Sequence, residues 1–204
     1  DDKIRRGKPA THIKYGESTA ILAGNSLLTL AFEMIADKNY KISNATKIEL
    51  IKGLAACSGH SGIAGGQYLD LKFEKQKKIV NQVINMQKKK TGKLFNFCCF
   101  AVAVIAKKNN NTKKSLSKLG EDIGLLFQLA DDFIDIEGNQ KLAGKPIKKD
   151  KKKGKSTLIS LIGFKKAYNY SFKLKKDILR KLSKHGKKAD ELKNTVNFIL
   201  GRKF

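Results

Sequence analysis

Three aspartates stand close together in a segment that is otherwise apolar. Asp131 and Asp135 are four residues apart, so a helix would place their carboxylates on one face, with Asp132 beside them. Such acids repel one another and lose solvation when buried, unless a cation lies between them. Carboxylate oxygens suit Mg²⁺, which usually takes one or two of them together with substrate phosphate and water. The spacing therefore predicts that Asp131, Asp132 and Asp135 hold Mg²⁺.

An alternative interpretation is that these acids pair with lysines on the surface of the protein. The neighbouring positions are apolar on all sides of the predicted helix, which favours a buried helix and a bound cation. These positions are Leu125, Leu126, Phe127, Leu129, Phe133 and Ile134.

Several cations stand where they could bind phosphate. Arg5 and Arg6 are adjacent in an Arg-Arg-Gly-Lys-Pro turn, and two neighbouring arginines can divide two phosphate groups between them. Lys90, Lys145 and Lys155 each begin or flank a glycine-containing turn, where backbone can approach a ligand closely. Metal-bound carboxylates on one side and cations on the other predict a site that clamps a diphosphate.

Helices must position these side chains, because apolar residues recur at helical spacing along most of the chain. No stretch alternates at period two for long enough to predict a sheet, so the expected fold class is all-α. The helix at 17–36 is rich in Ala and Leu and is expected to be largely buried. A glycine-rich stretch at 59–67 should interrupt or kink the pattern. Helices are predicted at 17–36, 47–57, 75–90, 116–136, 167–182 and 190–200, with apolar segments at 94–106 and 157–164.

The composition is that of a globular protein. The 204 residues are 41% hydrophobic and include two prolines, which allows one domain with a sizeable core and excludes a disordered polyelectrolyte. The nearly uncharged apolar run 94–106 is well short of the ~20 residues that a membrane span requires, and we expect no transmembrane segment. The chain begins Asp-Asp-Lys rather than with Met, and we expect it to start partway through a longer protein.

The cysteines indicate a reducing compartment. Cys57, Cys98 and Cys99 are odd in number, have no Cys-x-x-Cys spacing and include an adjacent pair within an apolar run. We expect buried free thiols in the cytoplasm, and because the three histidines are scattered we do not expect a zinc site built from Cys and His.

The formal charge of +25 comes from 43 Lys and Arg against 18 Asp and Glu. Such a balance raises the possibility of a nucleic acid partner. Only four of the cations are arginine, and no helix-turn-helix, zinc-finger or aromatic RNA-binding motif accompanies the lysines. We therefore expect no nucleic acid partner and assign most lysines to solvated helix faces, apart from a cationic loop at 145–155 that suits a compact polyanion.

A set of motifs follows in order along nearly the whole chain. They are Arg-Arg-Gly-Lys-Pro at 5–9, Gly-Glu at 16–17 with Ala-Ile-Leu-Ala-Gly at 20–24, Gly-Gly-Gln at 65–67 with Asp70, Lys-Thr-Gly at 90–92, Phe-Gln at 127–128 with Asp-Asp-Phe-Ile-Asp at 131–135, and Gly-Lys at 144–145 with Gly-Lys-Ser-Thr at 154–157. Together they resemble the motifs of trans-polyprenyl diphosphate synthases. His12 and the Gly-Gly-Gln segment make the chain most similar to bacterial farnesyl or geranylgeranyl diphosphate synthases.

This resemblance implies a single polyprenyl synthase domain over residues 1–204, with the isoprenoid synthase helical bundle, truncated at its N-terminus. It implies a Mg²⁺-dependent prenyltransferase, usually a homodimer. Such an enzyme condenses isopentenyl diphosphate with an allylic diphosphate, dimethylallyl or geranyl, to farnesyl or geranylgeranyl diphosphate. Metal ions and cations stabilise the departing diphosphate, the allylic C–O bond ionises, and the isopentenyl double bond attacks the cation.

The resemblance also implies roles for individual residues. Asp131, Asp132 and Asp135 match the second aspartate-rich motif and should hold Mg²⁺, with Asp131 the most important. Arg5 matches the arginine that binds the allylic diphosphate, and Arg6 the one that binds isopentenyl diphosphate.

Further matches concern the cations and the polar residues beside the metal. Thr91 and Gln128 should turn their oxygens toward the carbocation, and Phe127 should contact the isopentenyl group. Three lysines match residues of the family that contact the allylic diphosphate: Lys90, Lys145 and Lys155. The residues expected to act in the chemical step are Lys90, Thr91, Gln128 and Asp131.

The chain departs from the family pattern at its N-terminal end. Asp1 and Asp2 are only the trailing edge of the family's first aspartate-rich motif, and the preceding Gly-Lys-Arg segment is absent. Smaller departures are Asn25, where Asp is usual, and Ala130, where a polar residue is common. We expect weak or absent catalysis by residues 1–204 alone.

Two other functions remain open on the sequence. One is a catalytically silent subunit of a prenyl synthase, although the intact acids and lysines argue against it. The other is a terpene cyclase of the same fold, although Arg6 and the Phe127-Gln128 pair favour a condensing enzyme. Product chain length, the preferred allylic acceptor and the role of the lysine excess are not determined by these residues.

Overall fold

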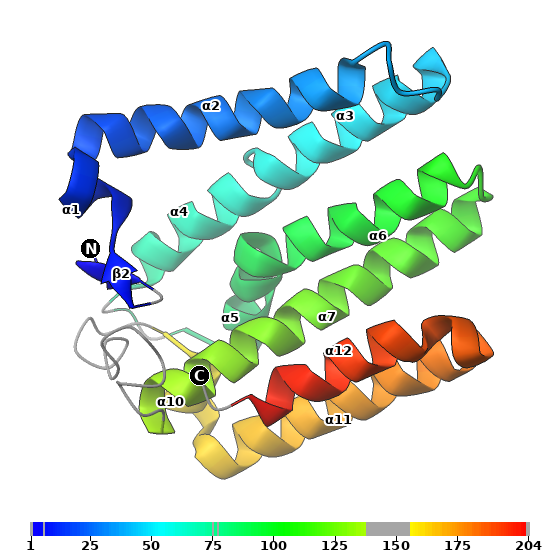
Figure 1. Ribbon diagram of the computed structural model, residues 1–204. Helices are drawn as coiled ribbons and strands as arrows, with labels where there is room; N and C mark the ends of the chain where they lie inside the picture. The colour runs from blue at the N-terminus through cyan, green and yellow to red at the C-terminus, as the bar shows by residue number, and fades with distance from the viewer. Residues whose placement is uncertain (1, 6, 75, 77, 138–155, 203–204) are drawn as a thin grey trace.

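The computed structural model describes residues 2–5, 7–74, 76, 78–137 and 156–202, and within them it is almost entirely helical (Figure 1). Helices α2, α3 and α4 lie along one side, α6 and α7 occupy the middle, and α11 and α12 lie on the opposite side. The prediction of an all-α fold is confirmed.

The N-terminal elements are a small hairpin followed by two helices. The hairpin pairs Arg5 with Lys8 in an antiparallel register, and Gly7 makes the turn with a φ of +73°, a conformation that glycine adopts without strain. The elements are β1 (Ile4–Arg5), β2 (Lys8–Pro9), α1 (Thr11–Tyr15) and α2 (Glu17–Ala36).

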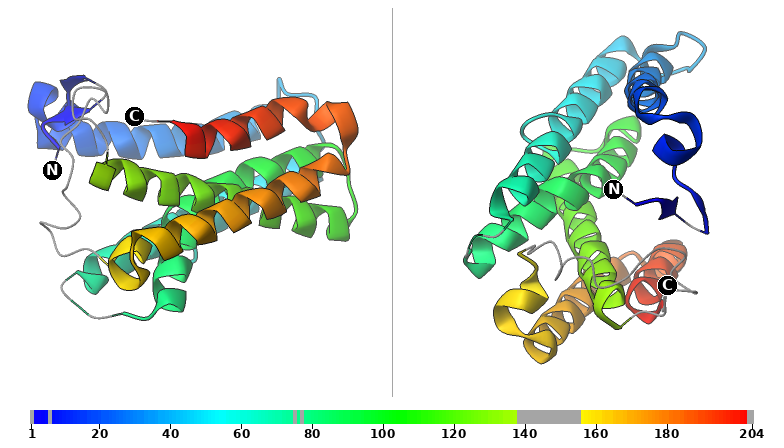
Figure 2. Two further views of the ribbon diagram at one scale, coloured as in Figure 1. Left: turned by 90° about the horizontal axis from the view of Figure 1, so that it is seen from below. Right: turned by 90° about the vertical axis from the view of Figure 1, so that its left-hand side faces the viewer.

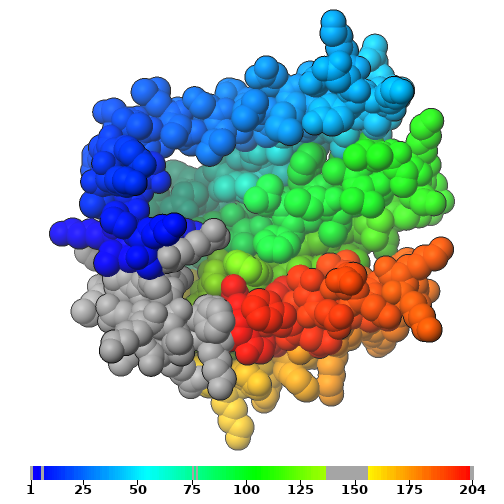
Figure 3. All heavy atoms as spheres, in the orientation of Figure 1, coloured from blue at the N-terminus to red at the C-terminus, as the bar shows by residue number. Residues whose placement is uncertain are grey.

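Helix α2 begins and ends where the apolar pattern predicts, but the expectation that it would be largely buried is wrong. None of its residues is buried, and Leu27 is 68% exposed. The helix contacts α1 and α3 and lies along the upper edge of the molecule in Figure 3. Most of its apolar surface is therefore exposed among the described residues.

Length and composition alone would also allow α2 to cross a membrane, with a mean hydropathy of 1.5 over its most apolar window. It is the one described helix that meets this test. This is weak evidence, because core helices of soluble proteins and signal sequences meet it too.

The next two helices are separated by the predicted glycine-rich interruption. Helix α3 (Asn44–Ser58) begins after Ser43, whose hydroxyl accepts a hydrogen bond from the Thr46 backbone N–H at 3.2 Å. Helix α4 (Ile63–Phe73) resumes after Gly62.

A further helical run contains one wide turn. Helix α5 (Val80–Gln87) continues directly into the π-helical turn η1 (Lys88–Gly92) and then into α6 (Lys93–Ile105). Single π-turns inside helices are frequent at functional sites, and this one contains the Lys-Thr-Gly motif. The predicted helix at 75–90 is therefore shorter at its start and is part of a longer run.

Helix α7 (Asn110–Glu137) is the central element. One core cluster joins Ile123 and Leu126 of α7 to Ile178 and Val196, and these four side chains are almost completely buried. The remaining elements are α10 (Leu158–Ile162), α11 (Phe164–Ser183), the 3₁₀ turn η2 (Gly186–Ala189) and α12 (Asp190–Gly201).

The three cysteines are free thiols, as predicted, but they are not all buried. Cys57 is buried and Cys99 is partly buried, whereas Cys98 is exposed. Neighbouring residues of a helix point about 100° apart, so α6 cannot direct both members of the adjacent pair into the core.

Candidate functional site

The three aspartates of α7 lie in its last two turns and differ in burial and in their partners. Asp132 and Asp135 are buried, with 4% and 8% of their surface exposed, whereas Asp131 is only partly buried. Because Asp131 and Asp132 are consecutive, they face different neighbours: Asp131 meets the C-terminal end of α12, and Asp132 meets α5.

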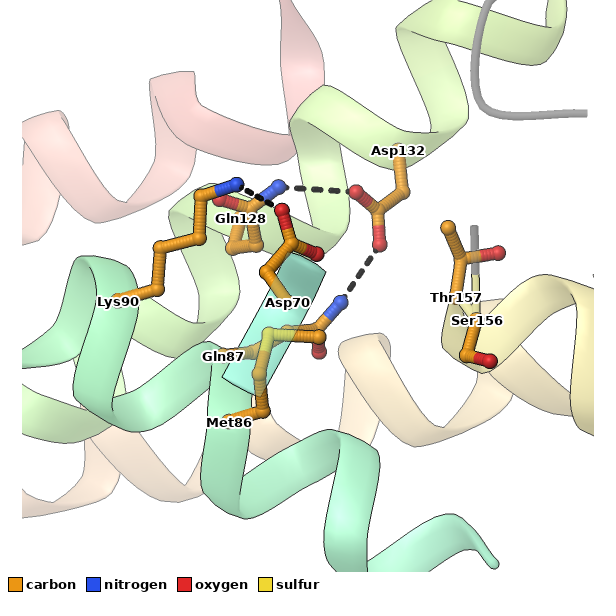
Figure 4. A pocket seen from close by; sticks show the side chains of 8 residues that line it. All are labelled: Asp70, Met86, Gln87, Lys90, Gln128, Asp132, Ser156 and Thr157. Atoms are coloured by element: carbon orange, nitrogen blue, oxygen red, sulfur yellow. Dashed lines mark hydrogen bonds and ion pairs between the residues drawn. The ribbon is translucent and has the colours of Figure 1, made fainter. Parts of the chain in front are cut away.

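The carboxylate of Asp132 is held from two sides (Figure 4). Gln87 of α5 donates from Nε2 to Oδ2 at 2.8 Å, and Gln128, one turn earlier on α7, donates from Nε2 to Oδ1 at 2.9 Å. The Thr91 hydroxyl of η1 in turn donates to Gln128 Oε1 at 2.7 Å. These three hydrogen bonds link α5, α7 and η1 around a single buried acid.

Lys90, predicted to bind diphosphate, lies beside this network. Its Nζ is 2.5 Å from Oδ2 of Asp70, a nearly buried acid of α4. Such a short contact between opposite charges fixes the ammonium group at the edge of the site. Asp70 belongs to the Gly-Gly-Gln motif, but sequence reasoning gave it no role; an acid within an apolar helix was the signal that could have identified it.

Glycines allow the helices to approach closely enough to build the site. A Cβ on Gly66 of α4 would lie 2.2 Å from the backbone nitrogen of Lys90. A Cβ on Gly124 of α7 would lie 2.7 Å from the Cα of Gly92. Side chains at either position would therefore push η1 away from α4 or α7.

A small cavity of about 30 Å³ opens between these elements, with room for a group the size of water. Figure 4 shows the acids and amides on one side and α10 on the other. The lining residues are Asp70, Met86, Gln87, Lys90, Gln128, Asp132, Ser156 and Thr157.

Asp131 is paired with an arginine that the sequence analysis did not assign. Arg202, just after α12, donates from one guanidinium nitrogen to Asp131 Oδ1 at 2.6 Å and to the Phe127 backbone carbonyl at 3.1 Å. The same guanidinium lies over the Phe127 ring, 4.1 Å from its centre. Arg202 is one of only four arginines in the chain, and this scarcity was the available signal.

The structure brings together only part of the predicted site. Thr91, Gln128 and Asp132 form one hydrogen-bonded chain that Gln87 completes. The pair of Lys90 and Asp70 lines the same cavity as Gln87, Gln128 and Asp132. Arg5 is exposed on β1 and is not part of this group. The small hairpin with β2 lies toward the same end of the molecule as the C-terminal end of α7 (Figures 1 and 2). Three predicted phosphate-binding residues lie outside the described residues: Arg6, Lys145 and Lys155.

The carboxylates fit a metal that keeps other ligands. Within the described part of the chain, no group of three or more His, Cys, Asp or Glu side chains is close enough to hold a metal ion by itself. Mg²⁺ does not require such a cage, because it commonly binds one or two carboxylates and completes its octahedron with water and substrate phosphates. An oxygen-only donor set at the end of α7 is compatible with that coordination.

Comparison with known proteins gives a consistent result. The family model described as "Polyprenyl synthetase" matches residues 1–199. Farnesyl diphosphate synthase of Escherichia coli is 35% identical over 207 aligned residues, covering 99% of this chain and 69% of that protein. Farnesyl diphosphate synthase of Bacillus subtilis is 34% identical, with coverages of 90% and 63%. The chain thus spans about two thirds of the length of these relatives.

Solved structures of prenyl synthases also match the fold of this chain. A geranyltransferase from Helicobacter pylori, in a complex with magnesium and isoprenyl diphosphate, matches with a TM-score of 0.84 and 32% identity, over 98% of this chain and 65% of that one. A synthase from Zymomonas mobilis described as FPP/GFPP synthase also matches with a TM-score of 0.84, at 34% identity, with coverages of 97% and 66%.

Proposed function

Because the chain belongs to the polyprenyl synthetase family, we propose that it acts as a trans-prenyltransferase. The proposed reaction joins isopentenyl diphosphate to dimethylallyl or geranyl diphosphate and yields farnesyl or geranylgeranyl diphosphate. The similarity to the farnesyl diphosphate synthases of Escherichia coli and Bacillus subtilis supports this assignment.

One observation carries the proposal. The hydrogen-bonded group around Asp132 places a buried acid, two amides and a threonine hydroxyl next to the Lys90 ammonium group. Fixed acids beside a fixed cation are what ionisation of an allylic diphosphate needs, because negative charge leaves on the diphosphate while positive charge develops on carbon.

The chain's own residues have distinct parts in this reaction. In this proposal Lys90 stabilises the departing diphosphate as the C–O electron pair moves onto oxygen. The oxygens of Thr91 and Gln128 are assigned to the resulting allylic cation. The π electrons of isopentenyl diphosphate then form the new C–C bond, and a proton leaves, with the released diphosphate as its acceptor. Arg5 and Arg6 bind the two substrate diphosphates, and Phe127 contacts the isopentenyl group.

We assign the metal to the end of α7. Asp131, Asp132 and Asp135 would hold Mg²⁺, which supplies positive charge that neutralises the diphosphate. The Helicobacter pylori geranyltransferase, whose structure contains magnesium and isoprenyl diphosphate, supports this choice of metal and ligand. The same proposal assigns diphosphate contacts to Lys145 and Lys155.

We further propose that the enzyme is cytoplasmic and that it forms a homodimer. The exposed apolar surface of α2 supports the homodimer, since such a surface on a 20-residue helix favours burial against another chain. Its exposed side chains include Ile21, Leu22, Leu27, Leu28, Leu30 and Met34. Sedimentation equilibrium tests the dimer: Leu27→Asp should yield monomers, and a Leu27→Asp protein that remains dimeric would place the interface elsewhere.

A condensation assay tests the function directly. The protein at its natural length is incubated with isopentenyl diphosphate, dimethylallyl diphosphate and Mg²⁺, and products are identified by mass spectrometry. We expect a C15 or C20 product that is lost in Asp131→Ala. The exposed control Asp190→Ala should retain activity, because Asp190 lies in the first turn of α12 and pairs locally with Lys193.

The assay also separates the alternatives. A folded protein that releases diphosphate from an allylic substrate without consuming isopentenyl diphosphate would be a cyclase. A folded protein that processes neither substrate would be a silent subunit.

A further inference from the structure

Within the part of the chain that the structure describes, the buried Gln87 side chain at the end of α5 has one polar atom that is hydrogen-bonded and one that is not. Its side chain is 3% exposed, and Nε2 donates to Asp132 Oδ2 at 2.8 Å across 45 positions of sequence. Its other polar atom, Oε1, is buried without a hydrogen-bond partner among the described residues. A buried acceptor without a donor destabilises a fold. Stability alone therefore does not explain an amide at this position.

The direction of the amide is determined by its neighbour. If the Gln87 amide were reversed, Oε1 would face the Asp132 carboxylate, and two acceptors would repel each other. Gln128 is fixed in the same way, because the Thr91 hydroxyl donates to its Oε1 and leaves Nε2 to face Asp132. Each oxygen of the Asp132 carboxylate thus receives an N–H, one from α5 and one from α7.

Two donors on opposite oxygens restrict a carboxylate more than one donor can. Without the Gln87 donor, one restraint on rotation of the Asp132 carboxylate about its Cβ–Cγ bond would be lost, and Gln128 and Thr91 could move with it. Gln87 supplies this restraint from a helix other than α7 and is itself enclosed by the core. The precision of the network therefore depends on Gln87, at the opposite end of the hydrogen-bond chain from Thr91.

We propose that Gln87 is a positioning residue, which fixes the plane of the Asp132 carboxylate and, through it, the Gln128 amide and the Thr91 hydroxyl. This inference rests on the proposed function, because it names the residue that orients Asp132, proposed to bind the metal, and Gln128 and Thr91, proposed to stabilise the carbocation. In this proposal Gln87 acts through the Asp132 carboxylate, not on substrate or metal directly.

Two variants at position 87 and one control test the proposal in the protein at its natural length. Gln87→Leu keeps a similar volume but removes the donor. Gln87→His supplies a ring N–H at a similar distance from the backbone. Asn85→Leu removes an exposed amide from the opposite side of α5 and serves as the control. Each protein is titrated with Mn²⁺ in the presence of inorganic diphosphate by electron paramagnetic resonance, and kcat, KM and Tm are measured.

We expect Gln87→Leu to weaken Mn²⁺ binding by about 10- to 100-fold and to lower kcat by a similar factor, as loss of a group that orients a metal ligand typically does. Its Tm should stay within a few degrees of the wild type, because the variant also removes the unpaired Oε1. Gln87→His should recover Mn²⁺ affinity and kcat to within about threefold, and Asn85→Leu should match the wild type.

Unchanged Mn²⁺ affinity and kcat in folded Gln87→Leu would overturn the proposal. If Gln87→Leu does not fold, the test rests on Gln87→His, which keeps an N–H donor. A folded Gln87→His protein whose Mn²⁺ affinity falls about 10- to 100-fold would also overturn the proposal. Failure of the proposed function has a different signature, since the wild type would then give no condensation product. The Mn²⁺ titration needs no turnover, so it still measures the effect of Gln87 in that case.

Discussion

Arg202 and Asp131 form a close ion pair between the C-terminal end of α12 and the end of α7, with 2.6 Å between guanidinium nitrogen and carboxylate oxygen. The arginine is 12% exposed, and its bond to the Phe127 carbonyl and its stacking on the Phe127 ring hold it in place. The pair ties the last described helix to the predicted metal-binding acid, 71 residues away.

Removing this pair should destabilise the protein. Arg202→Gln eliminates charge-assisted hydrogen bonds from a partly buried position, so we expect a loss of about 1.5–3 kcal/mol in the free energy of unfolding, measured by urea denaturation. Arg180→Gln is the matched control, because Arg180 also pairs with an aspartate, Asp177, but is 77% exposed. That control should change stability by less than about 0.5 kcal/mol. Equal effects of the two substitutions would contradict a special contribution from Arg202.

Lys90 should be the lysine of η1 that binds diphosphate. Lys90→Met removes the ammonium group that Asp70 holds at the cavity, so the affinity for inorganic diphosphate with Mg²⁺ should fall about tenfold, equivalent to about 1.4 kcal/mol. The neighbouring Lys89→Met should have little effect, because Lys89 does not line the cavity. Isothermal titration calorimetry measures both. A similar loss in the two variants would indicate only a general effect of positive charge.

Gly66 should tolerate no side chain. In Gly66→Ala the new Cβ would meet the backbone of Lys90 rather than a flexible side chain, so α4 and η1 must separate. We expect a cost of about 1–3 kcal/mol, measured by denaturation, together with weaker diphosphate binding. Gly201→Ala, where no atom lies within 4 Å of the added Cβ, should remain within about 0.5 kcal/mol of the wild type. If Gly66→Ala is as stable as Gly201→Ala, the close approach does not constrain the site.

Glu121 should make the stability of the protein depend on acid pH. Burial alone would raise its pKa, but hydrogen bonds and charge from Lys93 and Lys118 outweigh burial and lower the pKa below its ordinary 4.5. A carboxylate with a lowered pKa stabilises the fold at pH values above its ordinary pKa. That contribution is lost as pH falls through the lower pKa of the folded state.

Glu121→Gln is therefore expected to be less stable than the wild type near neutral pH, by about 1 kcal/mol. The difference should shrink as the pH falls below 4.5, in thermal unfolding measured over a pH series. A difference that stays constant across the series would show that the charge of Glu121 is not what stabilises the fold.

The sequence predicted most of the helices, because periodicity is a local property of the chain. Helix α2 has the predicted limits, and α12 begins at the predicted residue. The same local pattern failed for burial. Apolar spacing shows that α2 has a side to cover, but not whether the described part of the chain covers it.

For the site too, local sequence predicts the residue types, whereas tertiary packing sets the partner of each side chain. The sequence alone predicts the chemistry, from the types and spacing of Asp131, Asp132 and Asp135 and from a Lys-Thr-Gly motif suited to phosphate. Only the tertiary structure decided that Asp131 meets Arg202 while its neighbour Asp132 meets Gln87. The reason is geometric: consecutive helical residues point about 100° apart, and the partner of each depends on which distant helix packs on that side.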